Sequence, residues 1–139
     1  MAWRSLLLSH ATLMRQLETE LEQETGLALA DYDVLAQLAI AGGELRMTDL
    51  ANRALISRSG MTRRVARLVN AGLVRRVDAH TDGRGVVVAL TDAGIARLKE
   101  TVPAHARGIA TYFVSRLNDE ELAALASALD KVTVDCTFG

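Results

Sequence analysis

Arginine is concentrated in one stretch of this sequence, ISRSGMTRRVARLVNAGLVRRV, which runs from Ile56 to Val77 and holds six arginines in 22 residues. The guanidinium group stays charged at any working pH, and its planar fork of donors matches phosphate oxygens and the edge of guanine. The same stretch contains no acidic residue. This chemistry indicates a nucleic acid as the partner.

The charge of the chain is segregated. Between Arg53 and Arg84, eight basic residues stand against two acidic ones, whereas the rest of the chain carries eight basic and fifteen acidic residues. The formal net charge of −1 therefore hides a cationic centre in an acidic body. Such a patch supplies the sequence-independent attraction to phosphate on which DNA binding rests.

The elements that must position these arginines follow from the spacing of apolar residues and from capping residues. Between residues 3 and 25, leucines and a methionine recur at spacings of three, four and seven, which predicts a long amphipathic helix ended by Gly26. A second helix is predicted over residues 29–40. A short extended piece over residues 44–47 follows two glycines.

Two further helices are predicted around the arginines. Thr48 is expected to cap a brief helix over residues 49–54, and Ser57 to cap a helix that ends near Ala71, before Gly72. The period of an α-helix divides this last helix into two faces. The expected buried face holds Met61, Val65, Leu68 and Val69, and the expected exposed face holds Ser59, Arg63, Ala66, Arg67 and Asn70.

Two valine-rich runs, over residues 73–78 and 86–90, flank the turn AHTDGRG and predict a β-hairpin. A short helix, a turn, a helix with an arginine face and a hairpin occur in the order of a winged helix-turn-helix. The second of these helices can enter the major groove. Arg84 at the hairpin tip can lie in the minor groove, with Asp82 placed to hold its guanidinium. The expected fold class is mainly α with a small β-hairpin wing.

Each of these features also has a purely structural interpretation. Arg63, Arg64 and Arg67 can form a solvated helix face, Arg75 and Arg76 can protect a sheet edge, and DGRG is a common turn. The order of the three pieces, with acidic residues excluded from between them, favours DNA binding. A winged helix that contacts proteins without touching DNA is the alternative function.

Helical texture continues beyond the hairpin. Thr91 can cap the next helix, Pro103 is expected to kink or break it, and Asn118 with Glu121 can form a capping box for a final helix. The first and last helices carry more leucine than so small a module needs, which predicts burial against a second copy, with the core of a monomer as the alternative. The leucines expected at that interface are Leu6, Leu13, Leu117, Leu122, Leu125 and Leu129.

The sequence resembles the MarR (multiple antibiotic resistance regulator) family over nearly its whole length. The resemblance rests on GLALADYDVLAQLA, on LRMTDLANRALISRSGMTRRVARLVNAGLVRR and on DGRGVVVALTDAG. It implies one MarR-like domain over residues 1–139, with dimerisation helices over 1–26 and 103–139 and a winged helix-turn-helix lobe over 29–91. It also implies a cytoplasmic transcriptional regulator, expected to be a repressor, that binds an inverted-repeat operator in double-stranded DNA as a homodimer.

The resemblance also carries over residue by residue to the DNA contacts. Many members carry an arginine where Gly83 stands, so this wing is expected to make one contact fewer. Ala28 stands where relatives often place a capping serine or threonine. With Arg67 from the exposed helix face and Asp82 beside the wing arginine, the expected DNA-binding residues are Ser57, Arg58, Ser59, Thr62, Arg63, Arg67, Asp82 and Arg84.

Relatives often respond to small aromatic acids or phenolic compounds, so the resemblance implies an effector of that class. Arg15 is available for its carboxylate. Each candidate also has a structural interpretation, because a histidine or tyrosine beside a helical interface usually packs and finds one hydrogen bond. The candidates for the effector pocket are Trp3, His10, Met14, Arg15 and Tyr32.

The sequence speaks against an enzyme and against a metal site or cofactor. The three histidines are scattered, and HExxH, CxxC, GxSxG and phosphate-loop patterns do not occur. The single cysteine, Cys136, cannot build a disulfide framework, which favours a reducing compartment. No apolar run approaches the length of a signal-peptide core or a membrane span, so no membrane association is expected.

Overall fold

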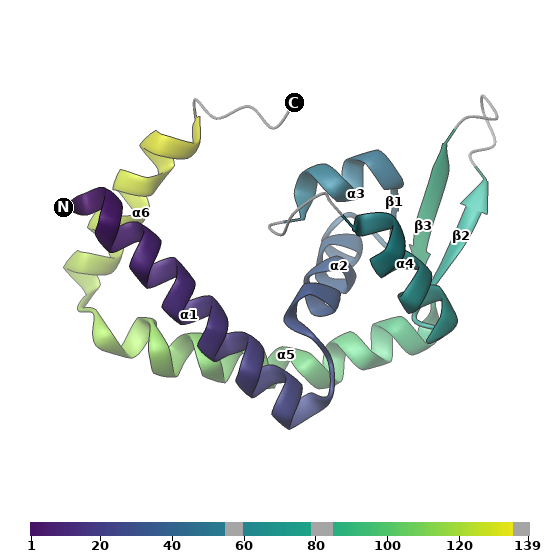
Figure 1. Cartoon of the computed structure of the whole chain (residues 1–139), viewed down its shortest axis with the longest axis horizontal. Coiled ribbons are helices and arrows are strands. Elements are labelled where there is room, and N and C mark those ends of the chain that lie inside the picture. Colours follow the sequence, from purple (N-terminus) through teal and green to yellow (C-terminus); the bar gives the residue numbers. More distant parts are fainter. Residues whose placement is uncertain (55–59, 79–84, 135–139) are drawn as a thin grey trace.

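The chain folds into two long antiparallel helices, a third terminal helix and a small lobe that holds the only described sheet. The computed structural model describes residues 1–54, 60–78 and 85–134. Figure 1 shows the lobe at one side of the molecule and the two chain ends of the long helices at the other. The elements in order are α1 (Ala2–Thr25), α2 (Leu29–Ile40), β1 (Glu44–Arg46), α3 (Met47–Arg53), α4 (Met61–Asn70), β2 (Val74–Asp78), β3 (Val86–Leu90), α5 (Asp92–Tyr112), the 3₁₀ turn η1 (Val114–Arg116) and α6 (Asp119–Val134).

The lobe contains the hydrophobic core. Its sheet is antiparallel, with the strand order β1-β3-β2, so the expected hairpin is confirmed and the extended piece at residue 44 becomes a third strand. The expected mainly α fold class with a small wing is confirmed as well. The buried core residues, which come from the α1–α2 link, from α2, α3 and α4 and from the sheet, are Leu27, Val34, Leu35, Leu38, Leu50, Met61, Val65, Leu68, Val74 and Val88.

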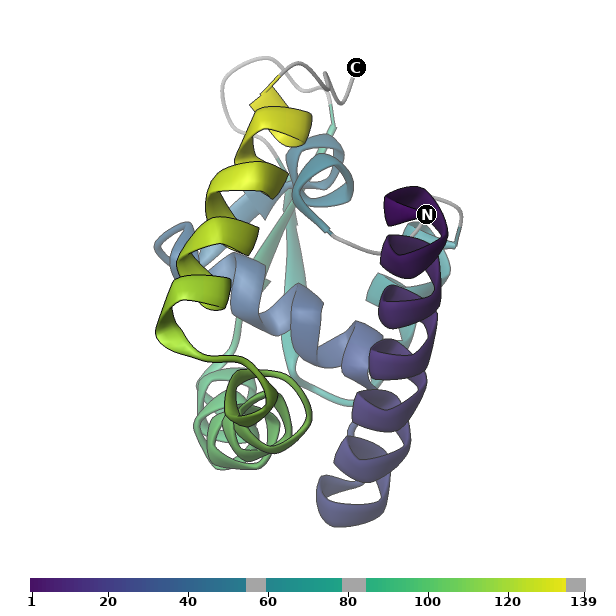
Figure 2. The ribbon, with the colours of Figure 1, turned by 90° about the vertical axis from the view of Figure 1, so that its left-hand side faces the viewer.

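Helix α5 joins the lobe to the rest of the chain, because it contacts both α1 and α2. In Figure 1 it runs along the bottom of the view, beneath both parts. Helix α6 is different, since none of its sixteen residues is buried and it packs extensively on no described element. Figure 2 shows that α1 and α6, which overlap in Figure 1, stand apart.

Several helix ends lie where capping chemistry predicts them. Gly26 ends α1 in the left-handed conformation, with a φ of 74°. The Thr91 hydroxyl accepts a hydrogen bond from the Gly94 N–H at 3.0 Å and caps α5. Asn118 and Glu121 form the expected capping box of α6, with reciprocal bonds of 2.8 and 3.0 Å.

Three expectations about the helices were wrong. Helix α3 begins at Met47, not at Asp49 under a Thr48 cap, because the pairing of β1 holds the chain extended up to Arg46 and the helix starts directly after it. Helix α4 begins at Met61, not at Ser57. The proline at position 103 does not break α5, which runs without interruption to Tyr112. Packing of α5 on two helices offsets the hydrogen bond that the proline removes.

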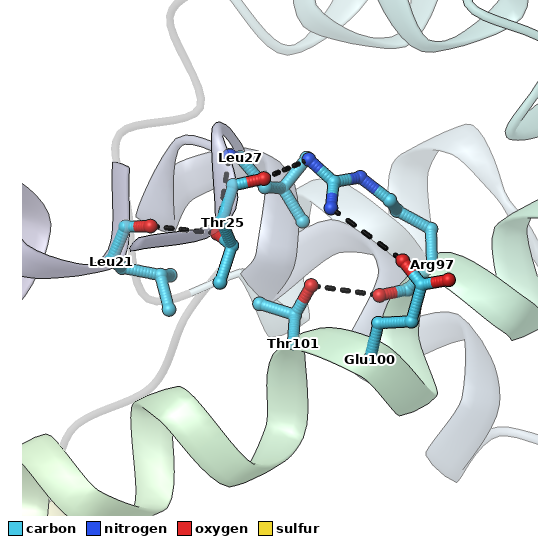
Figure 3. A network of polar contacts seen from close by, with 6 residues as sticks. All are labelled: Leu21, Thr25, Leu27, Arg97, Glu100 and Thr101. Atoms are coloured by element: carbon cyan, nitrogen blue, oxygen red, sulfur yellow. Dashed lines mark hydrogen bonds and ion pairs between the residues drawn. The ribbon is translucent and has the colours of Figure 1, made fainter. Parts of the chain in front are cut away.

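A polar network fixes the end of α1 on α5 (Figure 3). The Arg97 guanidinium donates a hydrogen bond to the carbonyl oxygen of Thr25, one of the last carbonyls of α1, which have no partner within that helix. A cation at a helix C-terminus also stabilises the helix dipole. The Thr25 hydroxyl donates to the Leu21 carbonyl at 2.6 Å and accepts from the Leu27 N–H at 3.2 Å. The orientation of the lobe on the long helices is therefore set at this junction.

Replacing Gly94 with alanine is expected to destabilise the protein. An added Cβ would lie 2.0 Å from the carbonyl oxygen of Leu73, so the turn between α4 and β2 would have to shift. We expect the free energy of unfolding in urea to fall by about 1–3 kcal/mol. The matched control is Gly108→Ala on the same helix, where the added Cβ would meet only a movable methyl of Leu17 at 2.8 Å. Equal stability of the two variants would contradict the close contact at Gly94.

Candidate nucleic-acid interface

Helix α4 divides into a buried face and an exposed face, as its sequence predicts. Met61, Val65 and Leu68 are at most 3% exposed, because they pack into the core of the lobe. Thr62, Arg63, Arg67 and Asn70 are exposed on the other side. The burial of one face thus presents a polar, cationic surface to solvent.

The start of α4 is set by a glycine. Gly60 has a φ of +85°, a left-handed conformation that glycine adopts without steric cost, and the first helical residue follows it. No side chain caps this helix start. Of the expected DNA contacts, Thr62, Arg63 and Arg67 belong to α4, while Ser57, Arg58, Ser59, Asp82 and Arg84 lie outside the described residues.

An ion pair that sequence reasoning missed connects α4 to α2. Asp31, in the first turn of α2, accepts a hydrogen bond from Nη1 of Arg64 at 2.9 Å. Nη2 of Arg67 lies 3.7 Å from the same carboxylate oxygen. Arg64 is thus partly buried against α2 rather than free to face DNA. No signal in a single sequence pairs positions 31 and 64, although an acidic residue in the first turn of a helix is a common stabilising feature.

The two arginines of β2 point to opposite faces of the sheet. Arg76 is the register partner of buried Val88 and shares its face with Val74, which is the core face that packs on α4. Arg75 is the partner of Ala89 on the other face. Both arginine side chains are exposed. Arg76 is therefore the strand arginine that lies on the same side of the sheet as α4.

The five candidate effector residues do not surround one cavity in a single chain. Trp3, His10 and Arg15 are exposed on α1, and Met14 is half-buried. Tyr32 lies on α2, with its ring centroid 4.8 Å from that of His105. A cavity of about 180 Å³ instead lies between α1 and α5, lined by other residues that include Leu17, Glu20, Glu24, His105, Gly108 and Tyr112.

Two groups beside this cavity have perturbed proton affinities. Burial lowers the pKa of His105 below its ordinary 6.5, with the charge of Asp33 acting in the opposite direction. The buried Nδ1 of His105 has no hydrogen-bond partner among the described residues. The pKa of Tyr112 is raised, first because its hydroxyl donates a hydrogen bond to Glu20. Sequence reasoning named neither residue, because both lie on the helical stripe typical of ordinary packing.

The expected interface leucines lie on the long helices, away from the lobe core. Leu6 is 38% exposed, and the other five are half-buried. Trp3, Leu7 and Leu8 add exposed apolar surface to the first turns of α1. Across residues 1–54, 60–78 and 85–134, no three His, Cys, Asp or Glu side chains gather as a metal site would require. No helix in that part of the chain has both the length and the apolar character needed to cross a membrane.

Comparison with known proteins points to a single family. The sequence profile of the MarR family matches residues 25–85. The HTH-type transcriptional regulator PecS of Dickeya dadantii (strain 3937) is 31% identical over 108 residues, which are 76% of this chain, and the chain spans 64% of the length of PecS.

Two solved structures are similar over nearly the whole chain. AbsC, a MarR family transcriptional regulator from Streptomyces coelicolor, is 34% identical with a TM-score of 0.86, covering 95% of this chain and 89% of AbsC. Sco3205, a MarR family regulator from the same organism that was solved in complex with DNA, is 34% identical with a TM-score of 0.87. That match covers 95% of this chain and 83% of Sco3205.

The stability of the protein is expected to fall in mild acid because of His105. Its pKa is depressed in the folded state, so the unfolded chain takes up a proton first, and stability present above about pH 6.5 is lost below it. Urea unfolding at about pH 7.5 and about pH 5.5 measures this loss. His105→Phe keeps an aromatic ring beside Tyr32 but cannot titrate, so it should lose less stability than the wild type. Parallel losses in both proteins would show that His105 does not contribute.

Proposed function

The chain belongs to the MarR family of transcriptional regulators, and on that premise we propose that it represses transcription by binding an inverted-repeat operator as a homodimer. The observation that carries the proposal is helix α4, whose apolar face is buried in the lobe and whose cationic face is exposed. Members of this family are regulators rather than enzymes. The protein would act in the cytoplasm, where the operator DNA lies.

Helix α4 would enter the major groove with its exposed face toward the bases. Thr62 and Arg63 lie in its first turn, the part of a recognition helix that reaches base edges. Arg67, one turn further on, and Arg76 on the neighbouring strand would meet phosphates. Ser57, Arg58 and Ser59, before α4, and Arg84 with Asp82 in the wing are proposed contacts from the family resemblance alone.

Dimerisation would be provided by residues 1–26 and 103–139, leaving residues 29–91 as the DNA-binding lobe. Helix α6 supports this division, because it has no buried residue in the single chain and an isolated helix of this length is marginal in water. The half-buried Leu122, Leu125 and Leu129 give α6 an apolar face that a second copy can cover. Two-fold symmetry would then place the two α4 helices about 34–36 Å apart on the DNA.

A small aromatic or phenolic effector would release the DNA. The supporting precedent is RdhR-CbdbA1625, a transcriptional regulator with the same fold at 20% identity and a TM-score of 0.80, which was crystallised with 2,4-dichlorophenol. In a dimer, Trp3, His10, Met14, Arg15 and Tyr32 are the proposed lining residues. Coupling between an effector and DNA of this kind is typically about 1–3 kcal/mol, which is a five- to hundredfold change in affinity.

Replacing Arg63 with alanine is expected to weaken operator binding selectively. A lost contact to a base edge should cost about 1–3 kcal/mol on a duplex that the wild-type protein selects from a random pool, and much less on a scrambled duplex. Fluorescence anisotropy at two salt concentrations measures both affinities. Arg75→Ala is the matched control, because it removes an exposed arginine from the sheet face turned away from α4. Equal losses on both duplexes, with a smaller salt slope, would make Arg63 a phosphate contact instead.

The protein is expected to be a homodimer at micromolar concentration. Light scattering should give about twice the chain mass of 15.0 kDa, since burial of the leucine faces favours association by roughly 25 cal/mol per Å². Leu125→Lys should shift the mass toward the monomer. Ser127→Lys adds the same charge at an exposed position of α6 and should leave the dimer intact. A folded wild-type monomer at that concentration would disprove the dimer.

A further inference from the structure

The Asp31 carboxylate lies at the boundary between the core of the lobe and the DNA-facing surface. Its side chain is 17% exposed, in the first turn of α2, where the positive end of the helix dipole stabilises a carboxylate. Both of its arginine partners belong to α4, and both approach the same oxygen, Oδ1. The only acidic group that these ion pairs bring to α4 therefore sits directly behind its cationic face.

The two arginines are held in different ways. Arg64 is 25% exposed and donates a hydrogen bond of 2.9 Å, so it fixes α4 against α2. Arg67 is 63% exposed and its ion pair is longer, at 3.7 Å. Arg67 can therefore leave Asp31 for a phosphate without disturbing the core, whereas Arg64 cannot.

We propose that Asp31 sets the discrimination of this surface between operator and random DNA, by fixing α4 through Arg64 and by withholding Arg67 from phosphate. The inference rests on the proposed DNA-binding function. It assigns a specificity-determining role to a residue that need not touch DNA.

The physical reason is that random and operator complexes draw on different contacts. A random complex gains its affinity from phosphates alone, and a carboxylate that repels phosphate and occupies an arginine weakens this term. Base readout instead requires α4 to enter the groove at a fixed angle, which the Asp31–Arg64 bond supports. One carboxylate thus lowers random affinity and preserves operator affinity.

The test is Asp31→Asn, which removes the charge and keeps the shape. Affinities are measured on a duplex selected from a random pool by the wild-type protein and on its scrambled version, across a salt series. Binding to the scrambled duplex should tighten about two- to fivefold, the range spanned by an exposed ion pair. Its salt slope should steepen by about 0.9 for each Arg67 that gains a phosphate. Affinity for the selected duplex should not rise with it, so the ratio of the two affinities falls.

The gain on scrambled DNA should disappear when Asp31→Asn is combined with Arg67→Gln, because the released arginine is then absent. An equal gain on both duplexes, or no gain on the scrambled one, would overturn the inference. A wild-type protein that binds neither duplex would overturn the proposed function itself, so the two failures are distinguishable.

A second comparison does not depend on Asp31→Asn folding. Arg63 and Arg67 share the exposed face of α4, but Arg63 forms no ion pair with any residue of the described segments. Arg67→Gln should therefore weaken binding to the scrambled duplex less than Arg63→Gln does, because Asp31 already occupies Arg67. A loss from Arg67→Gln that equals or exceeds the other would overturn the proposed competition.

Discussion

The burial of one face of α4 determines what the rest of this molecule can do. Met61, Val65 and Leu68 are held in the lobe core by α2, α3 and the sheet, and this packing leaves the arginine face no direction but outward. The Asp31–Arg64 pair fixes the same helix by electrostatics at the edge of that core. Hydrophobic burial therefore orients the cationic surface, and one ion pair refines the orientation.

Helix α5 extends this constraint to the other end of the chain. It contacts α2 in the lobe and α1 outside it, and Arg97 ties it to the last turn of α1. A displacement of the long helices would thus be transmitted to the lobe through one continuous element. Such a connection is what coupling between a dimer interface, an effector and two DNA-binding helices requires.

Local chemistry in the sequence predicted the elements, while tertiary contacts decided the details. Gly26, Thr91 and the Asn118–Glu121 box lie where capping rules place them, because each acts through neighbours within a few residues. The start of α3 depended on a strand pairing with residue 87, and the continuity of α5 through Pro103 depended on packing against two helices. The roles of Asp31 and Arg64 required a contact across 33 positions, which no periodicity within one helix encodes. The contacts proposed for residues 57–59 and for the wing tip rest on the family resemblance.

The most direct test of DNA recognition by a symmetric dimer is a selection of duplexes from a random-sequence pool by the purified protein. The proposed function predicts an enriched inverted repeat whose half-site centres are about 34–36 Å apart, one turn of the double helix. Binding to that duplex should weaken steeply as salt rises, because several phosphates are neutralised. Enrichment of no sequence, or affinity that does not change with salt, would contradict it.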